Sequence, residues 1–251
     1  MIIENSLTKV RCKKTLKKVF DKIKKIILWI VVAFFASTIL SVVILRWFPV
    51  YATPLMFIRL AQQVGAGEKM KWHHHWVPIE EMSPSLSLAV MASEDANFLS
   101  HHGFDFKAIE HAAMRNMKHP EKRKMGASTI SQQTAKNVFL WPGRSWTRKG
   151  FEVYFTTLIE VMWSKERIME VYLNSIEMGD GIYGADAVAE QHFNKTAKEL
   201  TRAQCALIAA TLPNPRRFNS AKPSKYMLKR QKRILHEMKF VKPLKEAGKD
   251  D

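Results

Sequence analysis

An uncharged apolar stretch of twenty residues, Ile26 to Leu45, constrains this chain more than any other feature of its sequence. As an α-helix it would be about 30 Å long, which matches the hydrocarbon thickness of a bilayer. Its polar side chains are Ser37, Thr38 and Ser41, and hydroxyls can bond to the backbone of their own helix. A cleaved signal peptide usually has a shorter apolar core, roughly 7 to 15 residues. We therefore predict one transmembrane anchor over residues 26–48.

The residues before the apolar stretch predict its direction. Nine of them are basic, and only Glu4 and Asp21 are acidic. Basic residues beside a transmembrane helix usually stay in the cytoplasm. We therefore expect residues 1–25 to form a cytoplasmic tail and everything after Phe48 to lie outside the cytoplasm.

The net charge of +17 indicates an anionic partner, and the hydrophobic content of 47% is ordinary for a folded protein. Without the basic tail the chain still has an excess of about ten positive charges. Nucleic acid, an anionic membrane surface and a phosphorylated substrate are the candidate classes, and charge alone does not choose among them. Cys12 and Cys205 would lie on opposite sides of a membrane, which excludes a disulfide between them. Cys205, in an apolar stretch, is expected in the core.

The outer part of the chain has helical periodicity and recurrent helix-start signals, and it has no sustained alternation of period two. It is therefore predicted to be mainly α, with no large sheet and at most a small hairpin near residues 72–77. We expect a linker and interfacial segment over 49–70, a domain over 71–241 and a flexible tail over 242–251. The expected helix-start residues are the following: Ser83, Asp105, Thr147, Ser164 and Thr201.

Three clusters of polar residues could carry chemistry. In the first, Glu94 and Asp95 end a predicted helix and precede a turn that contains His101 and Gly103. A carboxylate at such a helix end is well placed to act as a base. Taken alone, however, this cluster fits a solvated helix face better than an active site.

The second cluster combines hydroxyls, amides and a cation. It contains the following residues: Ser128, Thr129, Gln132, Gln133, Lys136 and Asn137. Such density suits a sugar, whose hydroxyls both donate and accept hydrogen bonds, and the lysine adds a point charge for phosphate. A capped helix start, with Ser128 or Thr129 as the cap, explains the same residues equally well.

The third cluster, Arg144 to Glu152, contains more cations than its glutamate needs. Arg148 and Lys149 lie four and three residues before Glu152, the spacing of an ordinary ion pair on a helix surface. That interpretation leaves the other cations unexplained. Arg144, Arg148 and Lys149, with Lys136 upstream, would instead hold a diphosphate.

In their order and spacing these clusters resemble the glycosyltransferase domain of peptidoglycan synthases, glycosyltransferase family 51. The resemblance covers roughly residues 88–235. Its motifs run through Glu94 to Gly103, Gly126 to Asn137, Arg148 to Glu152, Lys165 to Asn174, and Leu212 to Pro215. No Ser-x-x-Lys transpeptidase domain follows, so the chain is similar to the monofunctional biosynthetic peptidoglycan transglycosylases. Gln204 stands where the family is expected to have Glu, and either residue completes a capping box.

The resemblance implies a lysozyme-like glycosyltransferase domain with a membrane-facing small lobe, in the inner membrane of a Gram-negative cell. It implies that lipid II is polymerised by attack of the 4-OH of an acceptor N-acetylglucosamine on a lipid-diphosphate-linked glycan, with inversion. Glu94 would be the general base, and Glu152 would orient the cations on the donor side. The diphosphate would be bound by Lys136, Arg144, Arg148 and Lys149. The site would be shaped by Ser128, Thr129, Gln132, Gln133 and Asn137.

The resemblance further implies a divalent cation, Mg²⁺, as an aid at the diphosphate, although the sequence shows no ligand set for a metal. The expected partners are lipid II, the lipid-linked glycan strand, membrane lipids and the division or elongation machinery, with no nucleic acid. Leu140 and Trp141 are the predicted membrane-facing residues. His73, His74 and His75 point in different directions on any regular element, so a zinc site is not predicted. Arg230 is expected on a solvated helix face with a structural role.

Two other functions are considered. A lysozyme-like enzyme that cleaves glycan would share a helical fold and a catalytic glutamate, but it has no use for a diphosphate-binding cluster of cations. A membrane-tethered module that binds an anionic polymer, such as DNA or teichoic acid, would spread its basic residues along one face.

Overall fold

The computed structural model describes residues 2–122, 124–143 and 145–244, and it describes side chains of the N-terminal segment at 17, 18 and from 20 onward. Arg144, one of the predicted diphosphate-binding residues, lies outside the described residues, as do the side chain of Cys12 and most of the tail predicted over 242–251. The chain divides into two compact units, Met1–Leu45 and Arg46–Asp251, which are described separately.

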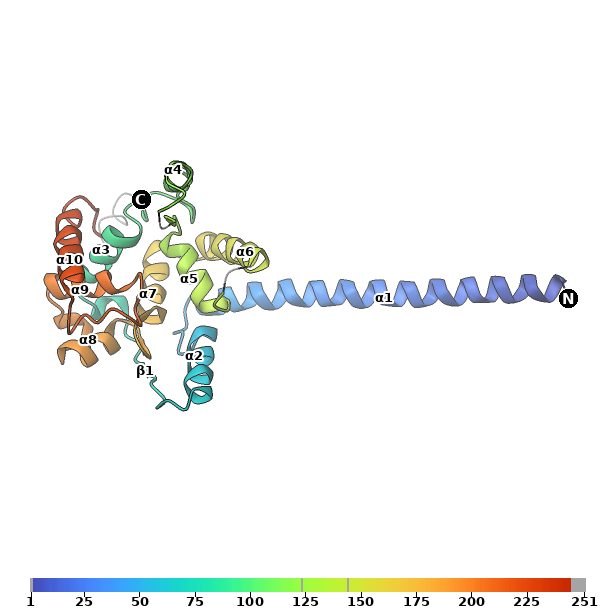
Figure 1. The fold of residues 1–251 in the computed structure, drawn as a ribbon. Coiled ribbons are helices and arrows are strands. Elements are labelled where there is room, and N and C mark those ends of the chain that lie inside the picture. The colour runs from blue at the N-terminus through green and yellow to red at the C-terminus, as the bar shows by residue number, and fades with distance from the viewer. Residues whose placement is uncertain (1, 123, 144, 245–251) are drawn as a thin grey trace. The chain divides into compact units, whose positions relative to one another are not determined.

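The first unit is one continuous helix, α1 (Ile2–Leu45), which extends from the N-terminus in Figure 1. Its segment Phe20–Leu45 is long and apolar enough to cross a membrane, and almost none of it is buried within the protein. The hydroxyl of Thr38 donates to the carbonyl of Phe34 at 2.9 Å, and that of Ser41 donates to Thr38 at 2.7 Å. These bonds satisfy the polar groups inside the helix, as predicted, so α1 is compatible with a single membrane anchor.

The second unit is mainly helical, which confirms the predicted fold class (Figure 1). The lysozyme-like architecture and the membrane-facing lobe stay predictions. The elements of this unit are α2 (Pro54–Gly65), β1 (His73–His74), η1 (Ile79–Glu81), α3 (Pro84–Glu94), α4 (Phe106–Lys118), α5 (Ile130–Phe139), α6 (Trp146–Met162), α7 (Lys165–Ser175), β2 (Glu177–Gly179), β3 (Ile182–Tyr183), α8 (Ala185–Phe193), η2 (Ala197–Glu199), α9 (Arg202–Thr211) and α10 (Lys225–Glu237).

Polar caps determine where most of these helices begin. Asp105 caps α4 and Ser164 caps α7 through side-chain oxygens, as predicted. Thr201 and Gln204 form the predicted capping box of α9. The prediction for α6 was wrong by two residues, because Ser145 rather than Thr147 accepts the free backbone N–H of the first turn.

The sheet is small, as predicted, but its pairing differs from the expected hairpin near residues 72–77. Its three strands lie in the order β1-β3-β2, with β1 parallel and β2 antiparallel to β3. His73 and His74 therefore pair with Ile182 and Tyr183, more than one hundred residues away. A local pattern cannot show such a long-range partner.

Helix α7 lies in the core and connects the sheet to the helices. Residues 168–169 and 171–175 are buried, and α7 packs against α5, α6 and α8. The buried Asn174 ties α7 to the segment before η1. Its Nδ2 donates to the carbonyl of Val77 at 2.9 Å, and its Oδ1 accepts from the backbone N–H of Val77 at 3.0 Å. On the other side, α3, α9 and α10 pack together, and Cys205 is buried there, as predicted.

Gly184 offers a sharp test of this packing. Its φ of 87° disfavours any other residue, and an added Cβ would lie 2.6 Å from the carbonyl oxygen of Asn174. We expect Gly184→Ala to lower the free energy of unfolding by at least about 2 kcal/mol. As a matched control, Gly150→Ala on α6, where nothing lies within 4 Å, should raise it by about 0.5–1 kcal/mol. Urea unfolding of the detergent-solubilised chain measures both, and equal effects would contradict the packing.

Candidate functional site

Glu94 is the last residue of α3, and its carboxylate is held by side chains from two other helices. Its Oε2 accepts from Nε2 of Gln133 on α5 at 3.3 Å, and its Oε1 lies 3.5 Å from Nη2 of Arg230 on α10. Ser93 donates to Oε1 at 3.1 Å. The side chain retains 16% exposure, so the carboxylate is oriented and still reachable by a substrate.

Its neighbour Asp95 has a different task. Its side chain is buried and accepts from Nε2 of His101 at 2.9 and 3.0 Å and from the backbone N–H of Ile130 at 2.9 Å. The ring of His101 accepts from the N–H of Gly103 through Nδ1 at 3.2 Å, so its proton lies on Nε2. Asp95 therefore ties the end of α3 to the start of α5 and to the turn between α3 and α4.

Helix α5 begins with a capping box. Thr129 accepts from the N–H of Gln132 and donates to the carbonyl of Gly103 at 2.7 Å, and Gln132 closes a capping box back to Thr129. Both side chains are buried, whereas Ser128 is exposed. The sequence left open a sugar-binding cluster and a capped helix start. The capped helix start accounts for Thr129 and Gln132, whose buried contacts fix the geometry of the site.

Gln133 connects the carboxylate of Glu94 to the core. While its amide nitrogen donates to Glu94, its Oε1 accepts from the hydroxyl of the buried Tyr172 at 3.3 Å. Burial, followed by the negative charges of Glu94 and Asp95, raises the pKa of Tyr172 well above its usual value. The tyrosine thus stays a donor and fixes the orientation of the Gln133 amide.

The predicted ion pairs of α6 are present but are not ordinary surface pairs. Arg148 donates through Nη1 to Glu152 at 2.6 Å, and Lys149 donates to the other carboxylate oxygen. Glu152 is only 3% exposed and Arg148 only 9%. A carboxylate this deeply buried must be paired, since removing a partner leaves an uncompensated charge.

Lys136 links the two glutamates. Burial lowers the pKa of its ammonium group, Arg148 and Lys149 lower it further, and the charges of Glu152 and Glu94 oppose the shift. Lys136 therefore lies within electrostatic range of both carboxylates and of both described cations of α6. Lys136 thus interacts with charged residues from the two other motifs, Glu94 from the first and Arg148, Lys149 and Glu152 from the third, and Arg144 lies outside the described residues.

A cavity of about 260 Å³ opens beside Lys136 and Gln133 and extends between α2 and β2. Asn137 lines it and is 4% exposed, and the amide nitrogen of Asn137 has no hydrogen-bond partner among the described residues. Leu140 also lines it and is 3% exposed, so the prediction that Leu140 faces the membrane was wrong. Trp141, at 45% exposure, is accessible.

Arg230 was predicted on a solvated face, and the structure places it in the site instead. Its Nη2 donates to the hydroxyl of Ser93 at 3.0 Å and lies beside Glu94. The sequence contains a signal for this position, because Met227 and Ile234, which are buried, flank Arg230 at helical spacing on the same face of α10.

Comparisons with known proteins show which family this chain resembles. Residues 61–239 match the sequence model of the transglycosylase family. A biosynthetic peptidoglycan transglycosylase of Bacteroides thetaiotaomicron is 64% identical over 222 residues, which cover 87% of this chain and 89% of the relative. Proteins of the same name from Bdellovibrio bacteriovorus and Caulobacter vibrioides are 52% and 47% identical, over 87% and 84% of this chain and 87% and 89% of the relatives.

The different tasks of the adjacent carboxylates predict different losses of stability. Asp95→Ala leaves the N–H of Ile130 and the ring of His101 without their acceptor, so we expect the free energy of unfolding to fall by about 3 kcal/mol. Glu94→Gln keeps the shape of a half-buried side chain and should change it by less than about 1 kcal/mol. Urea unfolding of both variants checks this, and a larger loss for Glu94→Gln would reverse the assignment.

Proposed function

The chain belongs to the transglycosylase family and is a peptidoglycan glycosyltransferase of cell-wall synthesis, and we propose that it polymerises lipid II by inverting transfer of a lipid-diphosphate-linked glycan to the 4-OH of an acceptor N-acetylglucosamine. The observation that carries the proposal is that α5 brings Lys136 within one turn of Gln133, which donates to Glu94, while the charges of both Glu94 and Glu152 act on the pKa of Lys136. A sugar hydroxyl and a diphosphate leaving group need this combination of a base and cations.

Glu94 is the proposed general base. The acceptor hydroxyl is a weak nucleophile until its proton is removed, and a carboxylate within hydrogen-bond reach can take that proton. Gln133 and Arg230 orient the Glu94 carboxylate from two sides, and its remaining exposure admits the acceptor. Asp95 is not a candidate for this role, because its oxygens already accept from buried donors.

The cations near Glu152 are proposed to hold the leaving group. A diphosphate is a weak base, so its departure needs neutralisation of charge more than a proton. Lys136, Arg148 and Lys149 supply that charge, and Arg144 is proposed to join them. Glu152 accepts from both described cations of α6 and thereby fixes their direction. A buried pair is preorganised, so little reorganisation is required when the charge develops.

The exposed face of α6 supports contact with membrane lipid. The exposed residues on this helix form one uncharged stripe: Trp146, Thr147, Gly150, Val153, Thr157 and Val161. The opposite face is buried and contains Arg148 and Glu152. A helix on a water-facing surface usually has the reverse arrangement, with charges outside. We propose that this stripe and Trp141 meet the bilayer and that α1 anchors the chain in the inner membrane, with the catalytic unit in the periplasm.

The described residues do not form a site for a resident magnesium ion. Magnesium prefers carboxylate and other oxygen ligands, and both oxygens of Glu152 are already engaged by Arg148 and Lys149. Among the described residues no group of three or more His, Cys, Asp or Glu side chains gathers. A divalent cation remains a proposal for the substrate diphosphate, and no step above runs through it.

Polymerisation of lipid II by the full-length protein in detergent, with magnesium or with a chelator, tests the function. We expect glycan strands from the wild type and a loss of about 10²- to 10⁴-fold in Glu94→Gln, because the acceptor proton has no base. The matched control is Glu80→Gln, an exposed glutamate on η1, which should retain full activity. Wild-type turnover in Glu94→Gln would remove Glu94 from the mechanism.

The same assay separates the other two functions considered. Cleavage of finished glycan without formation of new strands would support a lysozyme-like hydrolase. If the assay shows neither polymerisation nor cleavage, the membrane-tethered binding module is the function that remains.

Lys136 predicts the alkaline limb of the pH profile. Its charge is needed at the diphosphate and its pKa is lowered, so kcat/KM should fall as pH rises through that lowered pKa. Lys136→Arg keeps the charge at higher pH and should move this limb upward, whereas Lys198→Arg, exposed on η2, should not. The lowered pKa also implies that wild-type stability rises with pH as Lys136 loses its proton, because the unfolded chain then binds more protons. If the alkaline limb of the kcat/KM profile stays at the same pH in Lys136→Arg, the titration of Lys136 does not cause it.

A further inference from the structure

The cavity beside Lys136 has a second charged wall, away from the two glutamates of the site. That wall consists of Arg59 on α2 and Glu177 on β2, whose Nη2 and Oε2 atoms lie 3.3 Å apart. Glu177 is 6% exposed. The reaction described above uses neither residue.

Three buried polar atoms from residues that line this cavity lack a hydrogen-bond partner among the described residues. Two of them are donors, the amide nitrogen Nδ2 of Asn137 and Nε of Arg59, and the third, Oε1 of Glu177, is an acceptor. An unsatisfied buried polar atom costs free energy, so such atoms in a native protein call for an explanation. A substrate group with one acceptor and one donor would satisfy the atoms of Asn137 and Glu177.

Apart from these residues, Gln133 and Lys136, the cavity wall is apolar. It includes Leu140, Ile176 and Leu212. The volume of about 260 Å³ is close to the lower end of small-molecule pockets, roughly 300 Å³, and therefore suits one sugar ring and its substituent. An acetamido group combines a carbonyl, an N–H and a methyl group, which match a donor, an acceptor and an apolar wall.

We infer that this cavity is a specificity subsite for the acetamido group of a substrate sugar, with Asn137 donating to its carbonyl, Glu177 accepting from its N–H, and the apolar wall enclosing its methyl group. This inference rests on the proposed function, because the subsite adjoins Lys136 and Gln133. It assigns Glu177 and Arg59 to substrate selection and gives Asn137 a defined contact.

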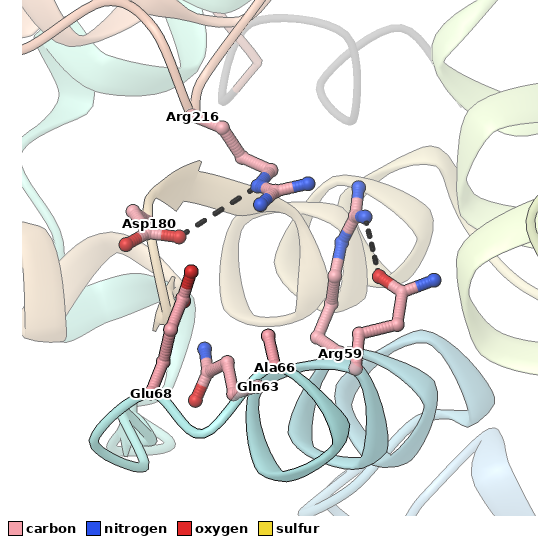
Figure 2. A pocket seen from close by; sticks show the side chains of 7 residues that line it. Arg59, Gln63, Ala66, Glu68, Asp180 and Arg216 are labelled. Atoms are coloured by element: carbon pink, nitrogen blue, oxygen red, sulfur yellow. Dashed lines mark hydrogen bonds and ion pairs between the residues drawn. The ribbon is translucent and has the colours of Figure 1, made fainter.

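Arg59 is the positioning residue of the subsite. Its Nη1 donates to Gln62 at 3.0 Å while its Nη2 holds Glu177. Burial raises the pKa of Glu177, and the nearby charges of Arg59 and Arg216 oppose that rise and favour the carboxylate form, which accepts hydrogen bonds. Figure 2 shows the smaller cavity that Arg59 also lines, where Arg216 points toward Asp180, 3.7 Å away. Arg59 thus lines both cavities.

The first experiment changes the apolar wall and the acyl group together. Lipid II with N-acetyl or N-propionyl sugars is polymerised by the wild type, Ile176→Ala and Leu212→Ala, and the ratio of kcat/KM for the two substrates is measured. We expect the wild type to prefer N-acetyl by about tenfold or more, and at least one variant to shift the ratio about tenfold toward N-propionyl. Leu228→Ala, exposed on α10, is the matched control and should keep the wild-type ratio. An unchanged ratio in both wall variants would overturn the subsite.

The second experiment tests the amide contact by combining a change in the protein with a change in the substrate, in the manner of a double-mutant cycle. Asn137→Leu should lower kcat/KM about ten- to a hundredfold with acetylated lipid II, and this loss should largely disappear with the N-deacetylated substrate, which has no carbonyl to receive the bond. A merely structural role of Asn137 would give the same loss with both substrates and would overturn the proposed contact.

A peptide amide of lipid II offers the same donor and acceptor, so a third substrate lacks the peptide. Persistence of the Asn137→Leu loss with this substrate supports the acetamido group, and its disappearance would assign the cavity to the peptide and overturn the sugar subsite. Failure of the proposed function is distinguishable from these outcomes, because the wild type would then make no polymer from native lipid II.

Discussion

The hydrogen bonds accepted by Asp95 are the interaction on which the site depends. Through Ile130 they fix the first turn of α5, and through His101 they fix the turn after α3. Glu94 lies at one end of this connection, and Lys136 lies less than two turns along α5. The distance between the proposed base and the proposed phosphate ligand is therefore set by a buried carboxylate that itself does no chemistry.

The site gathers charge inside the protein and leaves apolar surface outside. On α6 the buried side chains include Arg148 and Glu152, while the exposed stripe is uncharged. This arrangement costs desolvation energy, which the paired charges repay only in part. The proposed substrate is both lipid and diphosphate and gives a reason to retain this arrangement, because the lipid needs apolar surface and the phosphates need fixed cations.

Unsatisfied polar atoms are the other notable feature of this site, since three of those among the described residues belong to side chains that line one cavity. Asn174 shows how buried amides are treated elsewhere in the protein, because both ends of its side chain are bonded to backbone. Asn137 and Glu177 line a cavity, and one atom of each side chain, Nδ2 and Oε1 respectively, lacks a partner among the described residues. The cavity is therefore a better candidate for a ligand subsite than the helix start at Thr129, whose side-chain hydroxyl is hydrogen-bonded within the capping box and to Gly103.

The sequence by itself determined the long apolar helix at the N-terminus, the mainly helical class, most helix caps and the motif residues around Lys136, because apolar length, helical spacing and capping are local properties. It did not determine which of the adjacent carboxylates is structural, since Glu94 and Asp95 differ only in the partners that distant segments bring to them. It misplaced Leu140 and Arg230, because burial depends on which helix packs against a face. The pairing of β1 with β3 and of Arg59 with Glu177, 118 residues apart, exists only in the tertiary structure, where contacts are set by packing rather than by spacing along the chain.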